Sequence, residues 1–250
     1  MNLNIKNSAN ETLDYTFGKG SANSEKSEWI AILGHGVTGN KDRPIIKDTA
    51  DALNNAGFDT LRFSFAGNGE SGGDFREATI SKEVGDLNAV INAVSNEYKD
   101  IVYIGHSMGA AVGVIQTATD DRITALISIA GMIDTKAFAT TEFGEETPDE
   151  GLMWEEESCP LSSVFMDDLC KKIVSVEPTV SSVKTPWLLL HGSKDDVVDP
   201  KDSNQVKAIQ GESVTLRIIE GADHSFNDAS YKKEALDILT NWLDLQSLVK

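Results

Sequence analysis

Four short segments of this 250-residue chain carry side chains that could act together in nucleophilic chemistry. Ser107 lies within the sequence Gly-His-Ser-Met-Gly, between an apolar run at 101–104 and a stretch of small residues at 110–118. Glycines two positions before and after a serine leave room for a sharp strand-to-helix turn that exposes the hydroxyl. A serine hydroxyl is a weak nucleophile until a base takes its proton, so Ser107 needs a partner elsewhere in the chain.

The four histidines are the candidate bases, and each follows a segment that is expected to be a strand. His106 adjoins Ser107, and in a tight turn its side chain should point away from the hydroxyl and pack beneath the turn. His35 and His191 precede glycine at strand ends, where hydrogen bonds that stabilise the turn are the expected role. His224, in Gly-Ala-Asp-His-Ser-Phe after the last expected strand, is therefore the best candidate base.

A catalytic histidine needs a carboxylate that holds one tautomer and stabilises the imidazolium. Asp195, Asp196 and Asp199 follow the segment His-Gly-Ser-Lys just beyond an apolar strand. Aspartates in such a position commonly cap helices or stabilise turns. The chain order of serine, acid and histidine, however, is the order of α/β-hydrolases, and this order favours a triad that includes Ser107 and His224.

Attack by a serine on a carbonyl also requires donors for the oxyanion that forms. The backbone N–H of Met108, directly after the nucleophile, is one expected donor. The second is the backbone N–H of Val37, in the loop His-Gly-Val-Thr-Gly after an early strand.

The chain alternates between short apolar segments and amphipathic ones, which predicts a mostly parallel sheet covered on both faces by helices. In such sheets the carboxyl ends of the strands meet at one edge, which brings the four segments above together. The N-terminus is expected to form an antiparallel hairpin at the edge, from segments 3–7 and 12–17. The other expected strands are 29–36, 59–65, 100–106, 123–131, 186–192 and 214–221, and the expected helices are 41–56, 80–96, 108–119 and 231–248.

The alternation stops between residues 133 and 178, and we expect a small inserted cap there rather than a second domain. Residues 142–157 contain eight acidic side chains and no basic one, a pattern typical of a solvated outer face. Phe143, Trp154 and Phe165 could line a pocket for an acyl or aryl group, or they could anchor the cap to the core. The whole chain, 1–250, is thus predicted to be one domain.

Composition excludes several classes of partner. Forty acidic and 22 basic residues give a formal charge of −18, which repels nucleic acids and anionic lipid surfaces. No apolar run reaches membrane-spanning length, and the N-terminus lacks the pattern of a signal peptide, which predicts a cytoplasmic protein. Cys159 and Cys170 have no histidine nearby, so we expect reduced thiols and neither a disulfide framework nor a zinc site.

The segments GHGVTGNK, LRFSFAGNGESGG, GHSMG, HGSKDDVV and EGADHSF resemble those of α/β-hydrolase fold serine hydrolases, most closely the small bacterial cinnamoyl or feruloyl esterases. The resemblance implies Ser107 as nucleophile, Asp195 as acid, His224 as base, and Val37 with Met108 as oxyanion donors. It implies a hydrolase of small acyl or aryl esters that requires no cofactor and no metal. Because the same triad serves all acyl transfers, an amide, peptide or thioester hydrolase is an alternative. A slow ligand sensor that retains the triad is another.

Overall fold

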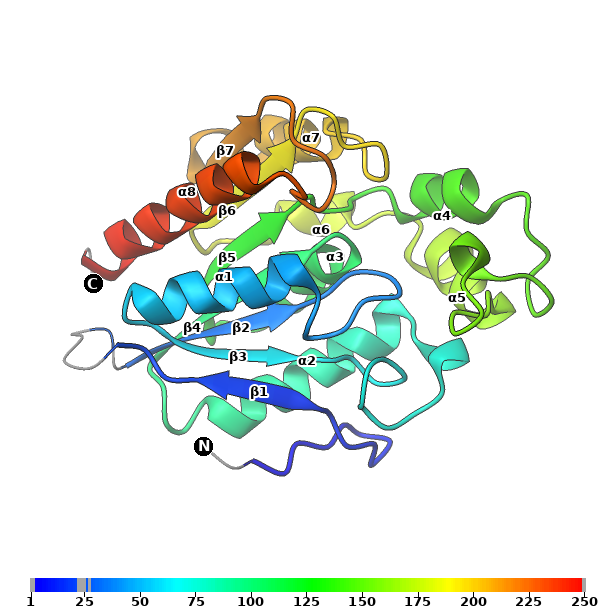
Figure 1. Cartoon of the computed structure of the whole chain (residues 1–250), viewed down its shortest axis with the longest axis horizontal. Coiled ribbons are helices and arrows are strands. Elements are labelled where there is room, and N and C mark those ends of the chain that lie inside the picture. Colours follow the sequence, from blue (N-terminus) through cyan, green and yellow to red (C-terminus); the bar gives the residue numbers. More distant parts are fainter. Residues whose placement is uncertain (1–2, 22–25, 27, 249–250) are drawn as a thin grey trace.

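The computed structural model describes residues 3–21, 26 and 28–248 and contains a seven-stranded sheet with helices on both faces (Figure 1). The strands are β1 (Tyr15–Gly18), β2 (Trp29–Gly34), β3 (Asp59–Phe63), β4 (Asp100–His106), β5 (Ile123–Ile129), β6 (Trp187–Gly192) and β7 (Val214–Ile219). The helices are α1 (Pro44–Asn55), α2 (Ile80–Val94), α3 (Met108–Thr117), α4 (Thr135–Phe143), α5 (Ser163–Asp167), α6 (Glu177–Val180), α7 (Lys201–Gln210) and α8 (Ala229–Leu248), with short helical turns η1 (Phe75–Glu77), η2 (Met153–Glu155), η3 (Asp168–Ile173) and η4 (Gly211–Ser213).

The strand order is β1-β3-β2-β4-β5-β6-β7, and every pair is parallel except β1 with β3. This is the α/β-hydrolase fold that the sequence predicts. Strands β2 and β4 are buried along their whole length, as their apolar sequences require for central strands. Residues of α1 and α8 pack in one apolar core on one face of the sheet, and residues of α2, α3 and α7 pack in the other.

The N-terminal hairpin is present in a shorter form than expected. A single antiparallel bridge joins Lys6 and Thr12, and the ladder strand that follows is β1, which pairs with β3. The strands also end earlier than their apolar runs suggest. β5 stops at Ile129 because Ala130 has φ 49°, which takes the chain out of the extended conformation.

Outside the inserted segment, α1 and α7 differ most from the prediction. Helix α1 begins at Pro44 rather than at residue 41, because proline favours the first helical position and Arg62 binds the carbonyl of Lys41 in the preceding turn. Helix α7 was not predicted at all. Its buried side includes Asp202, which accepts hydrogen bonds from the backbone N–H groups of residues 133 and 134, so it lacks the apolar stripe by which sequence analysis finds helices.

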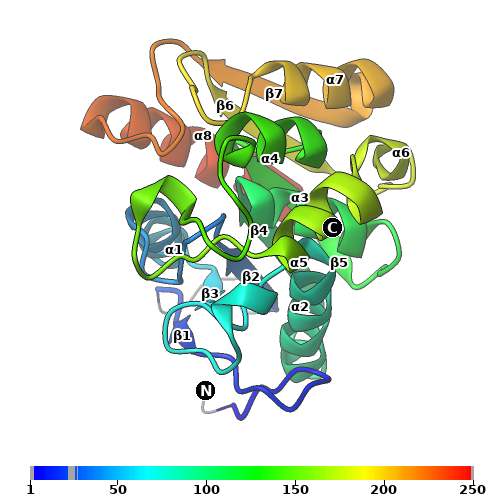
Figure 2. The same cartoon turned by 90° about the vertical axis from the view of Figure 1, so that its right-hand side faces the viewer.

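The segment between β5 and β6 carries α4, η2, α5, η3 and α6. It extends beyond the carboxyl ends of the parallel strands in Figure 1, and Figure 2 looks onto this end of the molecule, with α4 and α5 in front of the strands. Both cysteines of this segment are free thiols. None of the described helices is both long and apolar enough to span a bilayer.

Candidate active site

Ser107 occupies the turn between β4 and α3 with a backbone conformation of φ 55° and ψ −121°. A positive φ is strained for a residue other than glycine, and it persists only where neighbouring structure holds it. Here the N–H of Ser107 donates to the carbonyl of Ile129 at 3.0 Å, and its carbonyl accepts from Ala110 at 3.0 Å and Met132 at 3.3 Å. Strand β5 and helix α3 therefore fix the turn from two sides.

The glycines around Ser107 have a steric cause. A Cβ on Gly105 would overlap the carbonyl oxygen of Gly109, and a Cβ on Gly109 would overlap that of His35. A Cβ on Gly36 would come within 2.7 Å of the Ser107 Cβ. The close approach of three backbone segments, β2, β4 and α3, thus depends on the absence of side chains at these positions.

Gly105→Ala should therefore destabilise the protein by about 1–3 kcal/mol, the usual range for overpacking, and lower activity by displacing Ser107. Gly85→Ala is the matched control, because a Cβ at Gly85 in α2 meets nothing within 4 Å. Alanine in a helix interior stabilises by roughly 0.5–1 kcal/mol relative to glycine. Urea unfolding measures both variants, and equal effects of the two substitutions would contradict the steric argument.

His224 and Asp195 are in direct contact. The Nδ1 of His224 lies 2.8 Å from Asp195 Oδ2, and the Asp195 side chain is fully buried. Its other oxygen accepts backbone hydrogen bonds from Val197 at 3.0 Å and Val198 at 2.8 Å. Burial alone would raise the pKa of Asp195, but the hydrogen bonds from His191 and His224 lower it below its usual value. Asp195 is therefore an ionised carboxylate.

His191 is part of this arrangement, which sequence analysis missed. Its Nε2 lies 3.1 Å from Asp195 Oδ2 and 2.9 Å from the carbonyl of Val198, while its Nδ1 lies 2.7 Å from the Ser203 hydroxyl. Nε2 must carry the proton to satisfy both oxygens, so Ser203 donates to Nδ1. The spacing His-Gly-Ser-Lys-Asp, which places the histidine four residues before the acid, was the available signal.

His106 packs against His224, a contact that the sequence did not predict. The two rings are 4.8 Å apart between centroids, and Nε2 of His106 lies 3.1 Å from the His224 carbonyl oxygen. Burial, together with the neighbouring His224, lowers the pKa of His106 to about 3. A neutral His106 donates this hydrogen bond and supports one side of the candidate base.

His35 braces the loop that carries Val37. Its Nε2 accepts a hydrogen bond from the N–H of Phe65 at 3.0 Å, so its Nδ1 carries the proton and donates to the Gly36 carbonyl at 2.8 Å. Burial lowers the pKa of His35 to about 4, which keeps it neutral in this role. The expectation that His35 stabilises a turn agrees with these contacts. The turn that His35 stabilises packs against Ser107, because Gly36 in this turn lies next to the Ser107 side chain.

Ser107, His106, His224 and Val37 line one pocket. Its volume is about 390 Å³, counted as the space open to the centre of a water-sized molecule. Among the described residues, the Ser107 hydroxyl makes no hydrogen bond to His224, although both side chains line this pocket. The backbone N–H groups of Val37 and Met108 likewise have no acceptor within the described part of the chain. Val37 lines this pocket, and Met108 directly follows Ser107 in the chain.

The aromatic side chains that the sequence singled out in the inserted segment have different positions. Trp154 lines the pocket of Ser107, is 43% exposed, and donates from its indole to Glu142 at 2.7 Å. Phe143 is buried, with its ring 5.0 Å from Trp154 and 6.0 Å from Phe165 between centroids. Phe143 thus anchors the segment, whereas Trp154 faces the pocket.

No arrangement for a metal is found in residues 3–21, 26 and 28–248, where no three His, Cys, Asp or Glu side chains are grouped as ligands. Of the other two aspartates considered from sequence, Asp199 accepts a hydrogen bond from the N–H of Lys201 at the start of α7, and Asp196 is exposed. Asp195 is the one that meets His224.

Solved structures with the same fold include several esterases. The chain is similar to Est1E from Butyrivibrio proteoclasticus, in a structure with bound ferulic acid, at 25% identity and a TM-score of 0.84, covering 96% of this chain and 97% of that one. An esterase from Pyrococcus furiosus matches at 20% identity and a TM-score of 0.75, with 97% and 90% coverage. A monoacylglycerol lipase from Paleococcus ferrophilus matches at 19% identity and a TM-score of 0.74, with 92% and 98% coverage.

No curated protein sequence matches the chain. The model of the prolyl oligopeptidase family, Peptidase_S9, matches residues 46–248, which include Ser107, Asp195 and His224. This match spans most of the chain. The protein therefore belongs to the prolyl oligopeptidase family and is a serine hydrolase with the α/β-hydrolase fold.

Proposed function

We propose that the protein is a carboxylic ester hydrolase that acts on small acyl or aryl esters through a triad of Ser107, His224 and Asp195. The observation that carries the proposal is the contact of 2.8 Å between His224 and a buried, ionised Asp195, beside the Ser107 turn in one pocket. The bound ferulic acid in the similar Est1E structure supports an aryl ester, with hydroxycinnamoyl esters as the first class to test.

In this mechanism His224 takes the proton of the Ser107 hydroxyl as the oxygen attacks the ester carbonyl. Asp195 keeps the proton on Nδ1 of His224, so that Nε2 is free to act as the base. The N–H groups of Val37 and Met108 stabilise the oxyanion, and the N-terminus of α3 adds positive partial charge there. His224 protonates the departing alcohol. Water, activated by the same histidine, then releases the acid.

We propose that the segment 133–178 forms the cap over this pocket. Trp154, which lines the pocket from this segment, would contact the substrate. A mechanism of this kind needs neither a metal nor an organic cofactor, because the nucleophile, the base and the oxyanion donors are all groups of this chain.

A peptide or amide hydrolase is the second candidate, because the family that the chain matches is named after an oligopeptidase. The same triad would serve it, with His224 protonating an amine instead of an alcohol. Thioesters are a further class that this chemistry would hydrolyse.

The test compares Ser107-dependent kcat/KM for four substrates: a short p-nitrophenyl ester, methyl ferulate, an aminoacyl p-nitroanilide and an acyl thioester. We expect the two esters to be turned over fastest after correction for leaving-group reactivity. Faster turnover of the anilide would replace the proposal by the peptidase. A large thermal shift with methyl ferulate but no multiple turnover of any substrate would replace it by a ligand sensor.

A further inference from the structure

Glu83, in the first turn of α2, is a buried carboxyl that the triad does not use. Its side chain belongs to a residue only 1% exposed, and its Oε2 has no hydrogen-bond partner among the described residues. An unpaired polar atom in the interior is destabilising, so native proteins seldom keep one without a role. Glu83 lies beside Met108 and Val37, the two residues that carry the candidate oxyanion donors, because all three line one cavity.

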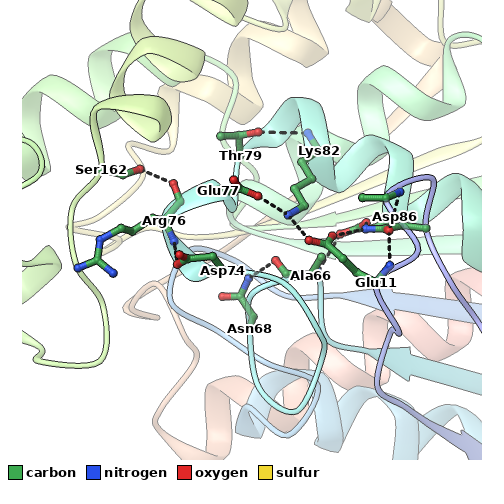
Figure 3. Close-up of polar contacts among 12 residues, drawn as sticks. Glu11, Ala66, Asn68, Asp74, Arg76, Glu77, Thr79, Lys82, Asp86 and Ser162 are labelled. Atoms are coloured by element: carbon green, nitrogen blue, oxygen red, sulfur yellow. Dashed lines mark hydrogen bonds and ion pairs between the residues drawn. The ribbon is translucent and has the colours of Figure 1, made fainter.

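The neighbouring charged groups have partners of their own, as Figure 3 shows for the network at the start of α2. Asp86 accepts hydrogen bonds at 2.8 Å from the N–H of Ala66 and from Asn7. Lys82, the basic residue next to Glu83, binds Glu11 at 3.0 Å and Glu77 at 3.5 Å. The ammonium group of Lys82 is therefore paired with Glu11 and Glu77.

Two further carboxylates, Asp86 and Asp168, lie near Glu83. Burial raises the pKa of Glu83 well above its usual value, and the negative charges of Asp86 and Asp168 act in the same direction. Asp168 accepts hydrogen bonds from the backbone N–H and the hydroxyl of Ser81, at 3.0 and 2.6 Å. This shift favours the neutral carboxylic acid form of Glu83, which can both donate and accept a hydrogen bond.

The cavity that Glu83 reaches has space for one small group. It offers about 10 Å³ for the centre of a water-sized molecule, roughly the room that a single water or hydroxyl oxygen needs. Its walls are mainly apolar and include Phe75, Met108, Met153 and Phe165. Methionine side chains adapt readily to an inserted group, so two of these walls can yield to an acyl chain.

The cavity adjoins the active-site pocket. Val37 and Thr38 line both spaces, and Met108 directly follows the candidate nucleophile in the chain. The acyl group of an ester bound at Ser107 would therefore lie next to an apolar cavity. That cavity contains one unsatisfied acid, Glu83.

We propose that Glu83 is a specificity residue that hydrogen-bonds a hydroxyl group at the far end of the substrate's acyl group. The inference rests on the proposed ester hydrolysis at Ser107. A hydroxyl matches a neutral carboxylic acid because each group both donates and accepts. An acyl group that ends in a hydrocarbon leaves the acid unpaired, and sites of this kind discriminate strongly against such analogues.

The test uses two ester pairs that differ only in the distal hydroxyl: methyl cinnamate with methyl 4-hydroxycinnamate, and ethyl hexanoate with ethyl 6-hydroxyhexanoate. For each pair we compare the kcat/KM of the hydroxylated ester with that of the ester without the hydroxyl. For the wild type we expect this ratio to be about ten or more for at least one pair, because losing the hydrogen bond would leave a buried group unsatisfied. Glu83→Leu should bring that ratio close to one. Glu83→Gln, which keeps a neutral donor and acceptor, should retain most of it.

Asp202→Asn is the matched control, because Asp202 is a buried carboxyl of α7 that is already hydrogen-bonded, does not line the cavity and does not act on the pKa of Glu83. It should leave the ratio at the wild-type value even if it lowers stability. Wild-type ratios near one for both pairs, or an unchanged ratio in Glu83→Leu, would overturn the assignment of Glu83 while leaving ester hydrolysis intact.

A binding measurement separates the two proposals. Thermal shifts by 4-hydroxycinnamic and cinnamic acid, and by the two hexanoic acids, report recognition without turnover. A preference for the hydroxylated acid that Glu83→Leu removes would support the role of Glu83 even if no ester were hydrolysed. Equal shifts for the two acids of each pair, in a protein that hydrolyses no ester, would reject both proposals.

The protonation state of Glu83 can be tested by measuring the free energy of unfolding of the wild type and of Glu83→Gln as a function of pH. A carboxyl whose pKa is higher in the folded state contributes its full stability below the unfolded pKa, near 4.5, and loses it as pH rises. The stability of Glu83→Gln relative to the wild type should thus increase from about pH 4.5 upward. Asp86, Asp168 and Tyr103, which face Glu83, are common to both proteins. A difference that stays constant with pH would contradict a neutral Glu83.

Discussion

We expect Ser107→Ala to lower kcat for a short p-nitrophenyl ester by about 10⁶-fold. This is the size of effect measured when the nucleophile of a catalytic triad is removed. The reason is that the Ser107 turn holds the hydroxyl in the pocket with His224, and alanine leaves no atom to form the acyl-enzyme. Alanine has the same Cβ as serine and only loses the hydroxyl, so it adds no atom to the turn. We therefore expect the folded protein to be retained, and thermal unfolding would verify this.

The matched control is Ser95→Ala, a change at the C-terminal end of α2, remote from the pocket. It should leave kcat and KM at their wild-type values. Mass spectrometry provides an independent readout, since an organophosphonate should label a peptide that contains Ser107 in the wild type and in Ser95→Ala. Residual turnover of Ser107→Ala above about one per cent of the wild type would reject Ser107 as the nucleophile.

Asp195→Asn should lower kcat by about 10⁴-fold, the effect of an acid-to-amide change that leaves the histidine in the wrong tautomer. Oδ1 of Asp195 accepts the N–H groups of Val197 and Val198, and an asparagine oxygen can still do so. Its amide nitrogen would then face Nδ1 of His224 and donate to it. The proton of His224 would move to Nε2, the atom that must accept the proton of Ser107.

Asp196→Asn is the control for this variant, because Asp196 is the exposed neighbour in the same loop. It carries the same loss of charge and should keep wild-type activity. The measurement is kcat on the p-nitrophenyl ester from pH 6 to 9, since a higher pH should not restore Asp195→Asn. Equal losses in the two variants would indicate a general effect of loop charge and would contradict the role of Asp195.

Much of the fold follows from local sequence. Near-continuous apolar runs form β2 and β4, and amphipathic periodicity forms α2 and α8, because each element must bury one face. The Ser107 turn was equally predictable, since only glycines permit the packing around it. Elements whose buried side is polar escaped prediction. Helix α7 is the example, because its buried Asp202 accepts hydrogen bonds from backbone N–H groups that lie 68 and 69 residues earlier in the chain.

The sequence by itself determined which residue types could react and in which chain order they occur, because these are properties of composition and local pattern. The resemblance to a known family indicated Asp195 as the acid, but only the tertiary structure shows its contact with His224 and the additional contact with His191. The tertiary structure alone revealed that Glu83 is unpaired beside the active-site pocket. These contacts depend on which strand ends come together in the fold, and the charge state of a side chain depends on its burial. Neither property can be read from the residues that are adjacent in the chain.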